Sequence, residues 1–363
     1  MFKKFALIAV LCFIIACYFG CQREEVVNNS VLSTSGVFVL YEGQFGVPAS
    51  YDYAFINLTN DSLYTNVYQN SNNGTFLNAF PDGILLNQNQ DLYLTAQGNF
   101  AGPGTIYKIN SANNQLISSL SFGSNPYNLV INNNKIYVTN LSGSSVTILD
   151  LNLNIMVSTL AVGPNPADLI YALGRIYVAK TSYTTENSLS IIDIFSNQVS
   201  KIFLNAPPVS AANNTGGVYV SDFTEKKLYV LDTLNATQII DSINLASFPA
   251  FTNEASGDIL AGDPQTLYIV GVDTVQFSNI GKILYKFNIT TRTLSVLIND
   301  PSITDMYGVS YESNNKRIYV ADNNGGSSNG EVRVYDINGQ FIKNYPDIGG
   351  RFPRRFAFKY TQQ

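Results

Sequence analysis

The sequence predicts an all-β chain that folds as a single seven-bladed β-propeller of four-stranded antiparallel blades, closed by its C-terminal strand. Composition is the first reason, because 23 Tyr and 22 Phe accompany only 13% charged residues, a balance that favours buried strands. The second is a short apolar run, such as "KIYVTN" at 135–140, that recurs every 40 to 55 residues. The third is a spare strand at the C-terminus, where "RFPRRFAFKY" occupies 351–360.

The N-terminus has the features of a secretory signal. "MFKK" is followed by fifteen apolar residues, which is shorter than the roughly 20 residues of a membrane span. The three cysteines of the chain, Cys12, Cys17 and Cys21, all lie here. The segment resembles a bacterial lipoprotein signal with Cys21 as the lipidated residue. Cys17 after "IIA" is an alternative site, and an ordinary secretory signal with incidental cysteines is another.

Cleavage before Cys21 leaves "CQREE", which resembles the tag that sends some Gram-negative lipoproteins to the outer face of the outer membrane. We therefore expect a lipid-anchored protein that faces the cell exterior. The expected organisation is a signal peptide at 1–20, a lipidated polar tether at 21–35 and one propeller domain at 36–363.

Four strand signals make up each repeat. A proline turn precedes a first strand, the apolar run forms the second, and a third strand ends in Asp or Asn before a weaker fourth, as in "IMVSTLAVG". Such a unit of 40 to 50 residues has the period of a propeller blade. The aromatic residues that mark the second strand are Phe38, Tyr93, Tyr137, Tyr177, Tyr219, Tyr268 and Tyr319.

The apolar run lacks the alternation of apolar and polar residues that is typical of a strand with one face exposed to solvent. A blade is covered on both faces by its neighbours, so its inner strands can be apolar at every position. A tyrosine in this place can bury its ring and direct its hydroxyl to a partner.

The chain ends predict how the ring closes. The "VFVLY" run at 37–41 has no strand before it, whereas residues 356–360 form a strand with no blade of their own. We expect this last strand to complete the N-terminal blade, which removes two exposed sheet edges. The count is then seven blades.

"VGPNPADLIYALGRIYVAK" at 162–180 resembles the YVTN-type propeller repeat, and this match is specific over about 115–230. "GVFVLYEGQFG" behind a lipoprotein signal is similar to the opening of YncE-like surface lipoproteins. The resemblance implies a non-enzymatic binding module. One branch of such families captures cobalamin for a TonB-dependent transporter, and no residue here identifies that branch. We expect capture of a nutrient, with a corrinoid as one candidate, for such a transporter.

Composition excludes several functions. Without histidine, the chain cannot form a Ser-His-Asp centre or a His-ligated metal site. The absence of Trp argues against the docking motifs of quinoprotein propellers. A net charge of −5 gives no nucleic-acid footprint. We therefore expect no cofactor, no metal, no nucleic acid and, apart from any partner, a monomer.

Two alternatives remain open. One is a protein-interaction or adhesion scaffold that binds no small ligand. The other is glycoside hydrolysis, which needs only two carboxylates at the right separation, with Glu42, Asp222, Asp273 and Asp322 near strand ends as its candidates. The loop at 322–331 carries oxygen donors, but a connection between strands explains its composition more simply than calcium does.

Topology predicts the ligand site at one end of the central channel, because loops before each innermost strand and after each second strand share that face. The position three residues after each marker aromatic does not repeat, and it is Ala96 and Gly271 in two blades. In the other five blades, it supplies the predicted ligand contacts Tyr41, Asn140, Lys180, Asp222 and Asp322.

The loops before the innermost strands add a second set of predicted contacts. Aromatic surfaces with a few polar anchors suit a partly polar organic ligand or a protein loop. This set consists of Phe80, Tyr127, Asp168, Phe251, Tyr307 and Arg354. The competing interpretation is that strand-end residues vary because they are solvated.

Overall fold

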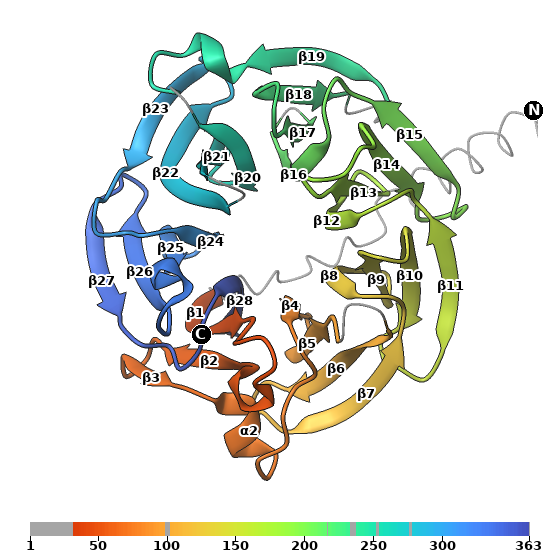
Figure 1. The fold of residues 1–363 in the computed structure, drawn as a ribbon, viewed down its shortest axis with the longest axis vertical. Helices are drawn as coiled ribbons and strands as arrows, with labels where there is room; N and C mark the ends of the chain where they lie inside the picture. The colour runs from red at the N-terminus through yellow and green to blue at the C-terminus, as the bar shows by residue number, and fades with distance from the viewer. Residues whose placement is uncertain are drawn as a thin grey trace, which may run out of the picture.

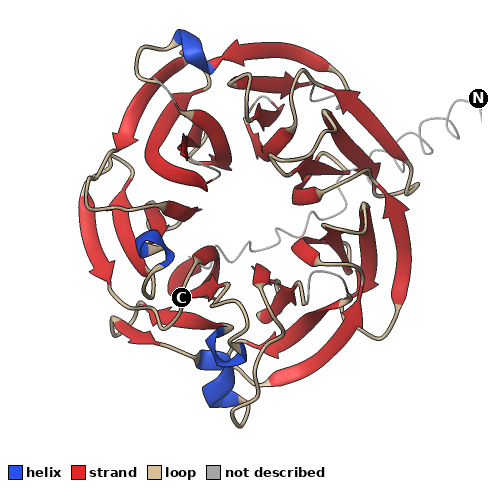
Figure 2. Cartoon of the chain, viewed as in Figure 1, coloured by secondary structure: helices blue, strands red, loops and turns tan. Residues whose placement is uncertain are grey.

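The computed structural model describes residues 32–98, 102–215, 217–232, 237–251, 254–275 and 278–362. Seven four-stranded antiparallel sheets form a ring around a central axis (Figure 1), so the predicted seven-bladed propeller is confirmed. Helical segments are few and short (Figure 2). The predicted signal peptide and Cys21 lie outside the described residues.

Each blade runs from an innermost strand at the channel to an outermost strand at the rim (Figure 1). Within the described ranges, four short helices lie in the connections: η1 (Pro48–Ser50), α2 (Val67–Ser71), η2 (Leu245–Ser247) and η3 (Asn324–Gly326). From inside to outside, the blades are β28 (Pro353–Gln362), β1 (Leu32–Tyr41), β2 (Asp52–Asn57), β3 (Ser62–Tyr64); β4 (Pro81–Leu86), β5 (Asp91–Ala96), β6 (Gly104–Asn110), β7 (Leu116–Phe122); β8 (Pro126–Asn132), β9 (Lys135–Asn140), β10 (Ser145–Asp150), β11 (Met156–Ala161); β12 (Pro166–Ala172), β13 (Arg175–Lys180), β14 (Ser188–Asp193), β15 (Val199–Phe203); β16 (Pro208–Asn214), β17 (Gly217–Asp222), β18 (Lys227–Leu231), β19 (Ile239–Asn244); β20 (Ala255–Ala261), β21 (Thr266–Val275), β22 (Ser278–Asn288), β23 (Thr293–Ile298); and β24 (Met306–Glu312), β25 (Arg317–Asp322), β26 (Glu331–Asp336), β27 (Phe341–Tyr345).

The C-terminal strand closes the ring as predicted. β28 pairs antiparallel with β1, and Phe356 and Phe358 face Val39 and Val37 in the register. β1 thereby gains a partner on each side, with β2 on the other. The ring is held shut by hydrogen bonds between the two ends of the described chain.

The apolar runs are buried on both faces, which confirms the reason for their composition. In β9, every residue from Ile136 to Asn140 is buried. Tyr137 packs in one cluster with Ile148 of its own blade and with Leu169 of the next. Burial of such clusters between adjacent blades is the main stabilising contribution to a propeller.

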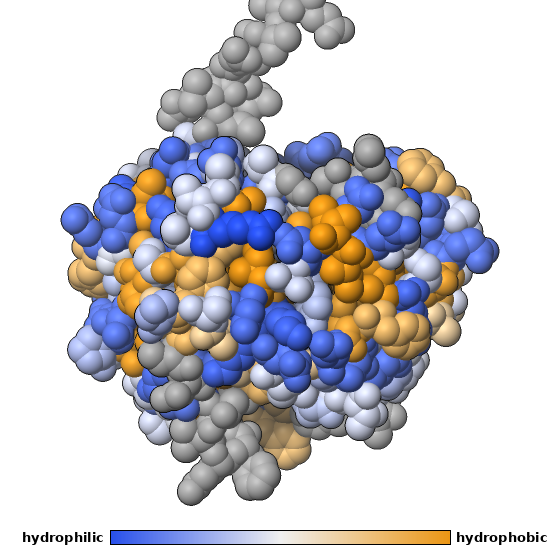
Figure 3. Space-filling model, turned by 90° about the horizontal axis from the view of Figure 1, so that it is seen from above, coloured by the Kyte–Doolittle hydropathy of each residue, from blue (hydrophilic) through white to orange (hydrophobic). Residues whose placement is uncertain are grey.

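The rim has a different surface. Its outermost strands expose large apolar side chains, among them Met156 on β11, Phe203 on β15 and Ile240 on β19. On the side of the ring seen in Figure 3, apolar patches lie among hydrophilic ones at mid-height. No helix of the described residues is long and apolar enough to cross a membrane.

A hydroxyl in the apolar run joins neighbouring blades. Thr139 Oγ1 accepts a hydrogen bond from the Asn128 N–H of its own blade at 3.1 Å and donates to the Ala167 carbonyl of the next blade at 2.8 Å. Thr95 makes the same pair of bonds between Gly83 and Tyr127. These contacts explain why a polar residue interrupts the run at this position in "LYLT" and "IYVT".

Replacement of Thr139 by Val is expected to lower the free energy of unfolding by about 1–3 kcal/mol. The shape is conserved, but a buried N–H and a buried carbonyl lose their shared partner. Urea denaturation measures the change. Thr139→Ser, which keeps the hydroxyl as Ser221 does in β17, should lose less. A loss in Thr139→Ser as large as that in Thr139→Val would show that the methyl group contributes as much as the hydroxyl.

Candidate functional site

All seven innermost strands carry a β-bulge directly after their first residues. In β8, for example, Pro126 faces Asn140 and Leu129 faces Val138, so Tyr127 and Asn128 together oppose one residue of β9. The other six innermost strands show a register shift at the same place. A bulge re-aims side chains out of the regular alternation.

The bulges direct side chains from six blades into one cavity of about 290 Å³ at the loop face of the channel. The cavity also reaches Thr181 and Tyr183, which follow β13, and Phe223, which follows β17. Its position is therefore the face that topology predicted. The bulge residues that line it are Tyr127, Asp168, Val209, Asp258, Tyr307 and Arg354.

A second cavity of about 370 Å³ extends along the innermost strands, lined by residues such as Ile84, Ser210 and Phe356. The two cavities share Asp168, Asp258, Val309, Arg354 and Arg355. They are thus adjoining parts of one channel.

An ion-pair network lies where the cavities meet. Arg354 Nη1 is 2.9 Å from Glu42 Oε1 and 3.4 Å from Asp82 Oδ2. Arg355 Nε is 3.2 Å from Asp82 Oδ1, and its Nη1 is 3.8 Å from Asp168 Oδ1. Asp82 is fully buried and bridges the two guanidinium groups, which would otherwise repel each other.

Burial changes the ionisation of this network. It raises the pKa of Asp168, although Arg355 lowers that pKa, and Asp258 raises it further. Asn128 Nδ2 donates to Asp168 at 2.7 Å and Ser210 Oγ donates at 3.2 Å. Burial likewise raises the pKa of Glu42. For both carboxyl groups, the neighbouring arginine opposes the rise in pKa that burial causes.

Two tyrosine rings lie close to the guanidinium group of Arg354. The Arg354 Cζ atom lies 5.0 Å from the ring centroid of Tyr127 and 5.6 Å from that of Tyr307, within the range of cation–π attraction. The Tyr307 hydroxyl donates to Glu42 Oε2 at 3.0 Å, and its ring packs on Phe352. The mouth of the channel is therefore held rigidly by paired charges and packed rings.

The structure brings four of the predicted ligand contacts, Tyr127, Asp168, Tyr307 and Arg354, together at this cavity. Two others lie elsewhere. Phe251 is buried in a cluster with Tyr285. Phe80 lies in a separate cavity of about 220 Å³ with Phe45 and Tyr51.

The other five predicted contacts, at the position that does not repeat, are buried. Lys180 also borders the mouth cavity, but its side chain is 1% exposed. With so little exposed surface, contact of these residues with a ligand stays a prediction. They are Tyr41, Asn140, Lys180, Asp222 and Asp322.

Two of these side chains, Lys180 and Asp322, hold the linkers that enter their own blades. Lys180 Nζ donates to the Val162 carbonyl at 2.5 Å, and burial lowers the pKa of Lys180 to about 8. Asp322 accepts the N–H groups of Thr304 and Asp305 at 2.8 and 3.0 Å. A linker that presents a carbonyl thus meets a Lys, and one that presents N–H groups meets an Asp. In these two blades, the residue type matches the backbone groups that the linker presents.

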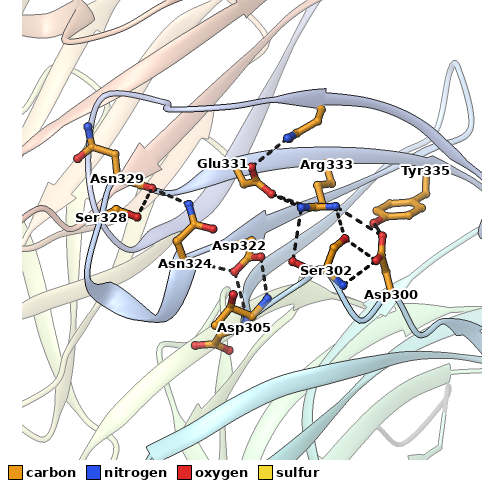
Figure 4. Close-up of polar contacts among 12 residues, drawn as sticks. Asp300, Ser302, Asp305, Asp322, Asn324, Ser328, Asn329, Glu331, Arg333 and Tyr335 are labelled. Carbon is orange, nitrogen blue, oxygen red and sulfur yellow. Dashed lines mark hydrogen bonds and ion pairs between the residues drawn. The ribbon is translucent and has the colours of Figure 1, made fainter.

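The loop at 322–331 is organised by the same kind of contact (Figure 4). Asp322 also accepts the Asn324 N–H at 3.0 Å, while Glu331 pairs with Arg333 at 2.5 Å. Within the part of the chain that the structure describes, no group of three or more His, Cys, Asp or Glu residues could hold a metal ion. In Figure 4, protein donors occupy the carboxylates of Asp300, Asp322 and Glu331.

Sequence reasoning did not name Asp82, Arg355 or Asp258 as ligand contacts, and it considered Glu42 only for hydrolysis. The proline turn before an innermost strand could have indicated Asp82 and Arg355, because they follow a proline by one and two residues in "PDG" and "PRR". Asp258 was hidden because β20 begins with Ala255 instead of proline.

Comparison with solved structures gives the fold and no more. A candidate 6-phosphogluconolactonase from Bacteroides uniformis ATCC 8492 superposes with a TM-score of 0.68 at 12% identity, covering 90% of this chain and 100% of that one. A quinonprotein alcohol dehydrogenase-like protein from Bacteroides thetaiotaomicron VPI-5482 gives 0.67 at 16%, covering 90% and 78%. The periplasmic gluconolactonase of Pseudomonas aeruginosa gives 0.65 at 14%, covering 89% and 99%.

No curated protein sequence matches the chain. One family model does, over residues 35–359, and its description is "Domain of unknown function (DUF5074)". The match spans nearly all of the propeller. The chain therefore belongs to the DUF5074 family.

Proposed function

We propose that this propeller is a non-enzymatic binding module that captures a small organic ligand at the mouth of its central channel. The observation that carries the proposal is the convergence of bulge residues from six blades on one cavity. Its volume of about 290 Å³, with the adjoining channel behind it, is at the lower end of the range for small-molecule sites.

The chemistry of the mouth favours binding over catalysis. Glu42, Asp82 and Asp168 each form an ion pair with Arg354 or Arg355, so they serve to fix the geometry. The chain has no histidine to act as a general base. The gluconolactonases among the structural neighbours are 12 to 14% identical, and lactone hydrolysis is therefore an outcome to test.

The cellular setting of the proposal follows from the N-terminus. A chain lipidated at Cys21 and exposed on an outer membrane would hold the channel mouth outside the cell, where it could pass its ligand to a TonB-dependent transporter. A corrinoid is much larger than the cavity at the mouth, so it would have to rest across the loop face.

Native mass spectrometry of the mature protein tests the proposal. The panel contains small amines, alcohols, carboxylates, corrinoids, siderophores, glycans and δ-gluconolactone. A one-to-one adduct with a compound that is recovered unchanged is the expected result. Hydrolysis of the lactone would replace the proposal by an enzyme, and a panel without any adduct would favour the scaffold alternative.

The double variant Tyr127→Ala/Tyr307→Ala is expected to weaken ligand binding by roughly tenfold or more, which corresponds to about 1.4 kcal/mol. Both rings border the cavity and hold Arg354. Titration calorimetry measures the affinity, and the variant should lose no more than a few kcal/mol of stability. Tyr64→Ala, which removes an exposed tyrosine at the rim, is the matched control. Unchanged binding in the double variant would place the site elsewhere.

A further inference from the structure

The charges around the channel do not balance. Glu42, Asp82 and Asp168 already pair with the two guanidinium groups of Arg354 and Arg355. Each guanidinium has a carboxylate on two sides, so neither is available to an incoming anion without breaking an existing pair. A fourth carboxylate then has no counterion.

That fourth carboxylate is Asp258, on the bulge of β20. It is exposed and lines both cavities of the channel. Among the described residues, no hydrogen bond or ion pair is formed by its side chain. It lies near enough to Asp168 for the two charges to interact, which helps to raise the pKa of Asp168. An anion entering the mouth would meet this negative potential, and a cation would relieve it.

A second group at the mouth also lacks a partner. Tyr127 is 8% exposed and borders the cavity, yet its hydroxyl makes no hydrogen bond with any described residue. A tyrosine hydroxyl can accept a bond from an N–H group. The hydroxyl borders the open cavity, so a ligand N–H group at this point would gain an acceptor that no described residue uses.

The aromatic surface suits the same ligand. Tyr183 is 67% exposed and lines the mouth, and a ring face attracts an organic cation. A bare metal ion fits less well, because the described residues contain no group of three metal-ligating side chains and the cavity is far larger than an ion.

We propose that the ligand of this site is an organic cation carrying a primary ammonium group, held by the Asp258 carboxylate with the Tyr127 hydroxyl as a further acceptor. This inference rests on the proposed function, since it names the chemical class that the channel captures. The neutral end of the ligand extends along the channel or over Tyr183.

A series of matched compounds separates charge from shape. Tyramine is a cation, tyrosol is its neutral alcohol analogue and 4-hydroxyphenylacetate is an anion; agmatine and spermidine add two aliphatic cations. Titration calorimetry of the mature protein at pH 7 is expected to show that at least one of the three cations binds. If tyramine is that cation, its affinity should be at least tenfold higher than that of tyrosol, and the anion should not bind.

Variants then assign the contact. Asp258→Asn is expected to weaken binding of the cation at least tenfold, and Tyr127→Phe by a few fold. Asp241→Asn removes the same charge at the rim, where Asp241 pairs with Arg292, and should leave the affinity unchanged. Thermal unfolding of each variant checks that the fold is intact.

The inference and the proposed function fail differently. A neutral or anionic compound that binds more tightly than all three cations, and loses affinity in Tyr127→Ala/Tyr307→Ala, would overturn the cation assignment and leave capture at the mouth standing. Binding of a cation that Asp258→Asn does not weaken would also overturn the assignment. If no compound of either panel binds, both are wrong.

Discussion

Deletion of residues 351–363 is expected to leave a chain that does not form a stable ring. β28 is the innermost strand of the first blade, so its loss exposes the hydrogen-bonding edge of β1. The rings of Phe356 and Phe358 also pack against Tyr319 of the preceding blade. One deletion thus removes a sheet partner, a contact between blades and both arginines of the channel.

The measurements are size-exclusion chromatography, limited proteolysis and thermal unfolding by circular dichroism. The truncated chain should aggregate or be cleaved rapidly, with no cooperative transition. A truncated chain that melts like the full one would show that β28 contributes little to closure.

A permuted chain supplies the control. Leu32 and Gln362 are partners in the register of β1 and β28, so a short turn can join the end of β28 to the start of β1. A chain that begins with residues 351–362, continues through such a turn to Leu32 and ends at 350 keeps every strand. It should fold, because closure requires the strand pair and does not depend on the order of the two strands in the chain.

The fold could be predicted in detail because its signals repeat. A blade that is covered on both faces requires an apolar second strand, and seven such runs determine the blade count. The first run lacks a preceding strand and the C-terminus has an extra one, which determines how the ring closes. The structure also explains the threonine at position 139 of this repeat, because its hydroxyl bonds to two backbone groups of adjacent blades.

The site could be predicted only in part, because its side chains lie on bulges. An alternation rule assigns residues to faces with a period of two, and one extra residue moves the following side chains to the other face. The sequence therefore indicated the neighbourhood of Tyr127 and Arg354 without showing that Asp82 turns toward Arg354 and Arg355. For Asn140, variation of the position did not indicate the structural contacts that its amide makes by donating to Ser145 and Thr147 inside its own blade.

Replacement of Asp82 by Ala is expected to produce the largest loss of stability of any single substitution in the channel network. Asp82 is fully buried, whereas the side chains of Arg354 and Arg355 keep 25% and 21% of their exposure. Removal of one partner of a buried ion pair leaves charge without compensation and costs on the order of 3 kcal/mol. The two guanidinium groups would then face each other, and Arg355 would keep only Asp168 at 3.8 Å.

Urea denaturation measures this loss, and Asp241→Ala provides the comparison. Asp241 pairs with Arg292 at the rim, where both side chains are partly exposed, and such a pair contributes about 1 kcal/mol or less. A similar loss for Asp82→Ala would mean that water already screens the network. In the double variant Asp82→Ala/Arg355→Leu, the like charge facing Arg354 is removed, while Asp168 loses a distant ion-pair partner but keeps its hydrogen bonds from Asn128 and Ser210. Part of the stability should therefore return. Recovery would show that the cost arises from charge, because the space left by Asp82 stays unfilled in the double variant. The bulge of β4 would then place this carboxylate to hold two like charges together at the channel.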